Sequence, residues 1–161
     1  MKVAWKPCAF LQNPRTCALN MANKEYLSRS APDPVGAYPH ARRAGDFIFL
    51  SGVGPRTSGT NEIPGNVYAA DGTLEAYDFA RQCHAVFRNV KKILEDTEAG
   101  WQDLVDVTVF LTDMKSDFSI FNEVYAEYFS ENRPCRTTVE VGSLPTDIAI
   151  ELKCIAYLGN D

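Results

Sequence analysis

Arg136 and Glu151 are the two residues of this chain whose types and surroundings are best suited to chemistry. Arg136 stands where a loop runs into a strand-like segment. A guanidinium group at such a point can hold a carboxylate through two parallel hydrogen bonds. An exposed ion pair with a nearby acidic residue would explain the same arginine equally well. The segment 136–151 is therefore a candidate site for an acidic ligand.

Glu151 lies between Ile150 and Leu152 in an otherwise apolar run. A glutamate in such a run either faces solvent at a sheet edge or occupies a polar pocket. Partial burial would raise its carboxyl pKa and would suit it to accept or relay a proton. The local sequence leaves both alternatives open.

Other chemistries have less support. Cys135 could be an activated thiolate beside Arg136, but no histidine lies near it in the sequence. The GxSxG motif of a serine nucleophile is absent, and the GVG tripeptide is too short for a dinucleotide-binding loop. His40 and His84 lack partners at the spacing of zinc ligands. We therefore expect neither a metal nor an organic cofactor.

The composition indicates one ordinary globular domain. The chain has 161 residues, 45% of them hydrophobic and 23% charged, with a formal net charge of −5. This charge argues against a general binder of nucleic acid or anionic membranes. No apolar run reaches the 18 or so residues of a membrane span. The five cysteines include no CxxC pair, which fits free thiols in a reducing cytoplasm.

The first 20 residues differ from the rest. They carry basic residues and two prolines but no acidic residue, and they lack the apolar stretch of a signal peptide. We interpret residues 1–20 as an N-terminal extension, upstream or non-native, with a targeting or regulatory arm as the alternative. Residues 21–161 are expected to form a single domain.

Apolar periodicity predicts elements in the order ββαβαββ. Asp71 or Thr73 is the expected cap of the first helix, Ser116 that of the second, and residues 56–72 read as a long loop. This order indicates an α+β fold in which two helices cover one face of a mixed sheet. The expected elements are strands 38–43 and 46–51 joined by a turn at 44–45, helix 74–96, strand 104–111, helix 117–130, and strands 136–141 and 148–157.

Each predicted element also carries an expected inward face. The first helix should bury Phe79, Cys83, Val86, Phe87, Val90, Ile93 and Leu94, the second Phe118, Phe121, Val124, Tyr125 and Tyr128, and the central strand Val105, Val107, Val109 and Leu111.

The second strand is apolar on both of its faces. Ile48 and Leu50 alternate with Phe47 and Phe49, so each side of the strand presents large apolar groups. Helices on one side cannot cover both. We therefore expect a homo-oligomer in which sheets of several copies pack against one another.

Several motifs together resemble the Rid (YjgF) family of imine and enamine deaminases. The resemblance covers about residues 26–158, and its motifs are specific in combination although each is weak alone. They read GAYPH at 36–40, FLSG at 49–52, DVTVFL at 106–111, FSIFNEVY at 118–125, RTTVEV at 136–141, LP at 144–145 and IE at 150–151.

The resemblance implies a chorismate-mutase-like homotrimer, with sheets packed into a central barrel and active sites in clefts between subunits. Arg136 would then bind the substrate carboxylate and Glu151 would position the hydrolytic water. The backbone around Thr138 would contact the substrate nitrogen or carboxylate. Many members carry cysteine at this position, so the threonine argues against a thiol role there. The remaining cleft residues by this resemblance are Tyr38, Gly52 and Asn122.

Within that family, segments 54–72 and 77–83 look most similar to bacterial 2-aminomuconate deaminases. Such an enzyme hydrolyses a six-carbon enamine diacid to 4-oxalocrotonate and ammonia in aromatic-compound catabolism. A second carboxylate calls for a second cation, which Arg56, or His40 with Arg42, would supply. The alternatives are a broad 2-iminobutanoate/2-iminopropanoate deaminase and a non-catalytic trimeric ligand-binding protein.

Overall fold

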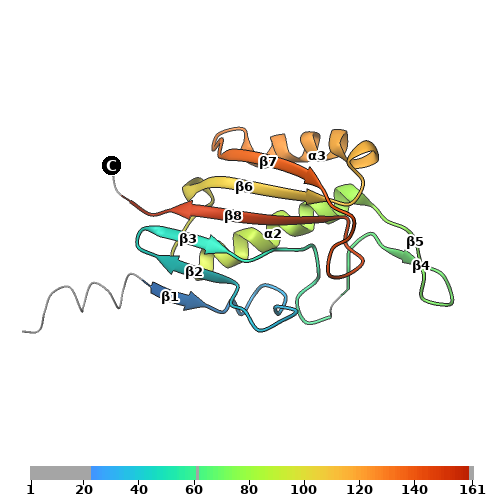
Figure 1. Ribbon diagram of the computed structural model, residues 1–161, viewed down its shortest axis with the longest axis horizontal. Coiled ribbons are helices and arrows are strands. Elements are labelled where there is room, and N and C mark those ends of the chain that lie inside the picture. The colour runs from blue at the N-terminus through green and yellow to red at the C-terminus, as the bar shows by residue number, and fades with distance from the viewer. Residues whose placement is uncertain (1–22, 61, 160–161) are drawn as a thin grey trace, which may run out of the picture.

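The computed structural model describes residues 23–60 and 62–159. The proposed extension, residues 1–20, lies outside them. A six-stranded mixed sheet in the order β1-β2-β3-β8-β6-β7 carries two helices, and a separate two-stranded hairpin joins β4 to β5 (Figure 1). All strand pairs are antiparallel except β6 with β7. The elements are β1 (Asn23–Tyr26), β2 (Ala41–Ala44), β3 (Phe47–Leu50), β4 (Val67–Tyr68), β5 (Leu74–Ala76), α2 (Phe79–Asp96), the 3₁₀ turn η1 (Trp101–Asp103), β6 (Leu104–Leu111), α3 (Met114–Phe129), β7 (Cys135–Glu140) and β8 (Ile150–Tyr157).

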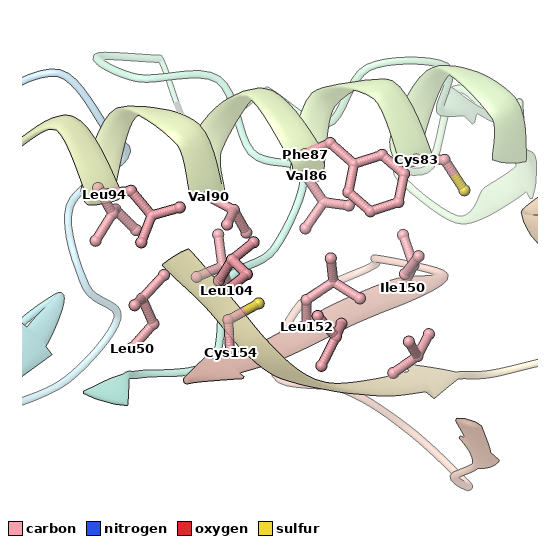
Figure 2. Close-up of a cluster of buried hydrophobic side chains, with 14 of the residues drawn as sticks. Leu50, Cys83, Val86, Phe87, Val90, Leu94, Leu104, Ile150, Leu152 and Cys154 are labelled. Atoms are coloured by element: carbon pink, nitrogen blue, oxygen red, sulfur yellow. The ribbon is translucent and has the colours of Figure 1, made fainter. Parts of the chain in front are cut away.

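The helix α2 lies behind the sheet in Figure 1, and its buried side chains pack against those of β6 and β8 to form the core (Figure 2). All seven residues predicted for its inward face are buried. Phe87 is fully buried and contacts a ring of aromatic side chains, including Tyr128 with a 4.6 Å centroid separation. The predicted α+β architecture with a mixed sheet and two helices is confirmed.

The predicted start of α2 is wrong by several residues. The helix is capped by Asp78, whose carboxylate accepts a hydrogen bond from the Arg81 backbone N–H at 3.0 Å. Asp71 instead accepts from the Thr73 N–H at 3.0 Å, beside Gly72 at φ +86°. These contacts turn the chain into the β4–β5 hairpin within the predicted loop. Residues 74–76 therefore form a strand.

The helix α3 also begins earlier than predicted. Asp113, rather than Ser116, is the cap, and its carboxylate accepts from the Ser116 N–H at 2.9 Å. Phe121 and Val124 are buried as predicted. Phe118, which was also predicted to face inward, is 36% exposed.

The central strand was predicted well, with one local exception. β6 spans the predicted residues, and Val107, Val109 and Leu111 are fully buried. Val105 is 40% exposed because the register with β8 shifts between Leu104 and Asp106. A bulge of this kind adds one residue and breaks the alternation of faces.

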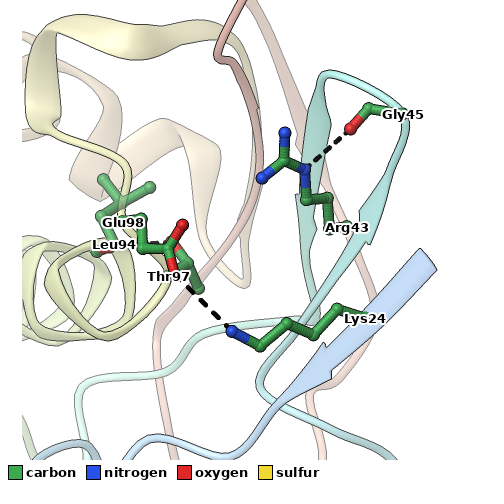
Figure 3. A network of polar contacts seen from close by, with 6 residues as sticks. All are labelled: Lys24, Arg43, Gly45, Leu94, Thr97 and Glu98. Atoms are coloured by element: carbon green, nitrogen blue, oxygen red, sulfur yellow. Dashed lines mark hydrogen bonds and ion pairs between the residues drawn. The ribbon is translucent and has the colours of Figure 1, made fainter. Parts of the chain in front are cut away.

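The strand β1, which no sequence pattern predicted, pairs with β2 at one edge of the sheet. Its Lys24 ammonium lies 3.7 Å from the Glu98 carboxylate, just beyond α2 (Figure 3). In the adjoining β2–β3 hairpin, Arg43 Nε donates to the Gly45 carbonyl at 2.8 Å. Gly45 has φ +63°, as the predicted tight turn requires.

The sheet face away from the helices keeps large apolar groups uncovered. Phe47 and Phe49 are 42% and 39% exposed, whereas Ile48 and Leu50 on the helix side are buried. Tyr157 extends this surface, with its ring 5.0 Å from that of Phe47. The apolar character of both faces of β3 is therefore confirmed. Within the described part of the chain, neither helix is long and apolar enough to cross a bilayer.

Candidate functional site

Glu151 lies in β8 on the face away from the helices. Its neighbours Ile150 and Leu152 are buried on the helix side, and Glu151 itself is half-buried. Across the sheet it pairs with Phe110 of β6. Burial raises the pKa of its carboxyl group. Glu151 is therefore a partly enclosed carboxylate rather than a residue that faces solvent at the edge of the sheet.

Gly52 provides the space that Glu151 occupies. The next residue, Val53, exchanges backbone hydrogen bonds of 2.8 and 3.0 Å with Leu152, which places Gly52 beside Glu151. A Cβ at Gly52 would overlap Glu151 Oε1 and lie 2.7 Å from its Cδ. Any larger residue would therefore displace the carboxylate.

Tyr38, Gly52 and Arg56 line one cleft, which reaches Glu151 through its neighbour Gly52. Tyr38 is 42% exposed, so its ring is accessible from solvent. Arg56 Nη2 donates to the Asp33 carbonyl at 2.6 Å. We call Tyr38, Gly52, Arg56 and Glu151 the Glu151 half-site.

His40 and Arg42, the alternative choice for a second cation, both have partners inside the protein. The Nδ1 of His40 accepts from the Ser28 N–H at 3.0 Å, and its Nε2 contacts the Pro32 carbonyl at 2.9 Å. Both ring nitrogens thus have partners inside the protein. Arg42 contacts Glu25 at 3.4 Å on β1. The role of second cation stays a prediction for either choice, since both His40 and Arg56 line the cleft with Gly52.

Arg136 lies in the edge strand β7, where it pairs with Val107 of β6. Its guanidinium carbon is 4.7 Å from the ring centroid of Tyr125 and 5.3 Å from that of Phe121, both on α3. Among the described residues, no carboxylate lies within ion-pair distance of it. The surface ion pair considered from the sequence is therefore not formed. Aromatic faces hold this cation while its donors remain available.

Asn122 and Thr138 lie on the same side as Arg136. Thr138 follows it by two residues in β7, so their side chains share a face. The Thr138 hydroxyl is buried and has no hydrogen-bond partner among the described residues. Asn122 is half-buried on α3, one turn from Phe118. We call Asn122, Arg136 and Thr138 the Arg136 half-site.

The two half-sites lie on opposite faces of the sheet. Val107, the partner of Arg136, is buried under the helices, whereas Phe110, the partner of Glu151, faces the other way. The strand β6 separates β7 from β8 in the sheet order. One copy of the chain therefore does not bring Arg136 and Glu151 together.

Two buried amides that the sequence analysis missed hold the backbone around Glu151. Asn89 and Gln82 are 4% and 0% exposed, and both lie on the inward stripe of α2. Their side chains contact the chain on either side of the Glu151 half-site. Polar residues within the apolar stripe were the signal that could have identified them.

The three cysteines among the described residues give no sign of nucleophilic chemistry. Burial raises the pKa of Cys83 and raises that of Cys154 to about 12, so both thiols stay protonated. Cys135 is exposed and free. In the described part of the chain, no group of three histidine, cysteine or acidic side chains could hold a metal ion.

Known proteins resemble this chain over most of its length. The family described as Endoribonuclease L-PSP matches residues 28–158. A RutC family protein of Pyrococcus abyssi is 41% identical over 137 residues, which cover 85% of this chain and 98% of the relative. These matches span the described domain and both half-sites.

Solved structures agree with this relationship. The YjgF gene product of E. coli is 33% identical with a TM-score of 0.71, over 83% of this chain and 98% of that one. TdcF of E. coli with bound serine is 32% identical with a TM-score of 0.72, at the same coverage. None of these names specifies 2-aminomuconate, so that finer resemblance stays a prediction. The chain belongs to the Endoribonuclease L-PSP family, the family of the RutC and YjgF proteins, as its Rid-like motifs predicted.

Proposed function

We propose that this protein is a hydrolytic deaminase of 2-imino and 2-enamino acids. The observation that carries the proposal is the pair of half-sites. One holds a partly buried carboxylate against Gly52, and the other holds an arginine that has no acidic partner among the described residues. A carboxylate anchor and a water-binding base are the two groups that imine hydrolysis needs.

Joining the half-sites requires more than one copy. We propose a homotrimer in which the uncovered apolar sheet faces pack inward as a barrel. Phe47, Phe49 and Tyr157 support this, because isolated exposure of such large groups is unfavourable. The edge strand β7 of one copy would then bring Arg136 to the Glu151 half-site of its neighbour. The substrate would lie in a cleft between subunits.

The reaction follows from the groups in the joined site. The enamine tautomerises to the imine, and Arg136 binds the carboxylate next to the imine carbon. Glu151 accepts a proton from water while the water oxygen adds to that carbon. Glu151 returns that proton to the nitrogen, which gives a neutral carbinolamine. The hydroxyl proton of the carbinolamine then passes to the amine, the C–N bond breaks, and ammonia and the 2-oxo acid are released. Water and imine are consumed in equal amounts, and no electrons are transferred.

The finer proposal is that the substrate is 2-aminomuconate and the product 4-oxalocrotonate. Arg56 supports this, because it lines the same cleft as Gly52 and could receive the second carboxylate. One of its contacts is a hydrogen bond from Nη2 to the Asp33 carbonyl, which holds the side chain at this cleft. Replacing Arg56 with alanine should raise KM for the diacid and leave KM for a monocarboxylate imine unchanged.

A broad deaminase for small monocarboxylate imines is the nearest alternative, and TdcF with bound serine favours keeping it. A non-catalytic ligand-binding trimer is the second. The family's description names an endoribonuclease, but the net charge of −5 does not favour RNA as the ligand. Neither histidine has both nitrogens open for acid–base work on RNA.

The test generates 2-aminomuconate and 2-iminopropanoate in separate assays and follows loss of absorbance with release of ammonia. The proposal expects ammonia release to depend on the protein and to fail with Arg136→Ala. Faster turnover of the diacid would support the finer proposal, and faster turnover of the monoacid the broad deaminase. Tight binding of 2-oxo acids without ammonia release would overturn deamination in favour of ligand binding.

A further inference from the structure

We propose that Asn89 and Gln82 are positioning residues that set the Glu151 half-site from beneath. The inference rests on the proposed deamination for its kinetic consequences. Both residues belong to α2, about two turns apart on the stripe that faces the sheet. Each contacts backbone of a different irregular segment, and the two segments flank Glu151 in space.

Asn89 holds the segment that contains Gly52 and Arg56. Its Nδ2 donates to the Gly54 carbonyl at 3.0 Å and to the Arg56 carbonyl at 2.9 Å. Both protons of one amide are thus used on alternate residues of a single loop. The contact fixes the direction in which the chain leaves Gly52, and with it the origin of the Arg56 side chain.

Gln82 holds the segment that leads into β8. Its Oε1 accepts from the Ala149 N–H at 2.8 Å, two residues before Glu151. Its Nε2 donates to Asn66 Oδ1 at 2.8 Å, and Asn66 in turn donates to the Asp147 carbonyl at 2.8 Å. The amides of Gln82 and Asn66 therefore clamp the backbone between Asp147 and Ala149.

Because Asn89 and Gln82 are buried, their hydrogen bonds strongly restrain the two loops. An amide or carbonyl group left without a partner in this core would cost free energy, so neither loop can move without breaking a satisfied bond. The two clamps meet where Val53 pairs with Leu152, beside the contact of Gly52 with Glu151. The helix thereby sets the separation between the carboxylate and the loop that faces it.

The two residues should act on different steps. Asn89 fixes the backbone of Arg56, so replacement of Asn89 should mainly raise KM for a diacid. Gln82 fixes the backbone just before β8, so replacement of Gln82 should displace Glu151 and thereby mainly lower kcat. Displacements near 1 Å are known to reduce rates by about a hundredfold, so effects of about tenfold to a hundredfold are expected.

The experiment compares Asn89→Asp, which keeps the shape but loses the N–H donors to Gly54 and Arg56, with Gln82→Met, which loses the acceptor for the Ala149 N–H. Asn89→Leu and Gln82→Leu serve if the first pair does not fold, and Lys91→Gln is an exposed control on the same helix. The measurements are hydrogen exchange of residues 52–57 and 148–153, the Glu151 carboxyl titration by ¹³C NMR, and KM and kcat for a diacid and a monoacid imine.

We expect faster exchange at 52–57 in the Asn89 variants and at 148–153 in the Gln82 variants. We also expect a Glu151 titration shifted toward the ordinary range, and the kinetic split described above. Variants that lose thermal stability but keep wild-type exchange, titration and KM-to-kcat pattern would overturn the inference. If the wild-type protein releases no ammonia, the proposed function fails, while exchange and titration still decide whether these amides position Glu151.

Discussion

The two half-sites differ in how much of their geometry one chain can fix. Around Glu151, a β-bridge at Val53, the space at Gly52 and two buried amides of α2 hold every segment in place. Around Arg136, an edge strand and the aromatic faces of α3 hold the cation, and its outer side is open. In the proposed trimer, the first would be formed before assembly, whereas the second would gain its function from a neighbouring copy.

The two half-sites suit different chemical roles. A carboxylate that must keep a raised pKa needs an enclosed, fixed environment. A guanidinium keeps its charge in any environment and needs only orientation. The Glu151 carboxyl therefore has to be buried for its role, whereas the Arg136 guanidinium can be exposed and keep its charge.

The largest effect is expected from Glu151→Gln. Removal of the base should lower kcat by about 10²- to 10⁴-fold with little change in KM. In the wild-type protein, activity should fall as pH drops through the raised pKa of Glu151, because the protonated acid cannot accept from water. Steady-state kinetics across pH measure both, with the exposed Glu131→Gln as control. Equal kcat for variant and wild type would contradict the assignment.

Arg136→Ala should lower kcat/KM by about a hundredfold, mainly through KM, because a bidentate charged contact is lost. Arg136→Lys should recover only part of this, since an ammonium cannot match the fork geometry. Arg133→Ala, three residues earlier and exposed, is the matched control. If the two alanine variants behaved alike, Arg136 would not be the anchor.

Gly52→Ala should lower kcat by about tenfold or more. The added Cβ overlaps the Glu151 carboxylate, so the side chain must rotate away from its position. Gly54→Ala is a useful comparison, because its Cβ would meet only the tip of Ile148, at 3.0 Å. A Gly52→Ala enzyme with wild-type kcat would show that Glu151 need not lie against this glycine.

The smallest expected effect is on stability. Because burial raises the folded-state pKa of Glu151, ionisation destabilises the fold as pH rises through the window between the unfolded pKa and the raised one. Above that window, Glu151→Gln should therefore have a slightly higher Tm than the wild type, and the difference should vanish below it. Thermal melts from acidic to neutral pH measure this. A variant that melts lower at neutral pH would oppose it.

The sequence predicted those parts of the fold that depend on one local pattern. The strand at residues 104–111 and the buried stripe of α2 follow from apolar period and length, and both were correct. The start of α2 was misplaced because Asp71 and Asp78 are both good caps, and the β4–β5 hairpin decides between them. Tertiary pairing of this kind leaves no local signal.

The sequence identified the residues of the candidate site, but it did not predict how they are placed relative to one another. Glu151 and Arg136 stood out by type and position, but their opposite faces depend on how β6 pairs with both β7 and β8. The contact between Gly52 and Glu151 spans 99 positions of sequence, from 52 to 151, and depends on the bridge at Val53. Such register follows from the assembled sheet rather than from any segment of it.

The most direct test of a site completed between copies is complementation of inactive chains. Arg136→Ala and Glu151→Gln chains would be unfolded together, refolded as a mixture and assayed for ammonia release. A shared site predicts recovery to about a quarter of the wild-type rate, because random assembly pairs an intact Glu151 half-site with an intact Arg136 half-site at that frequency. A refolded mixture no more active than either variant alone, while wild type treated identically regains activity, would contradict the account.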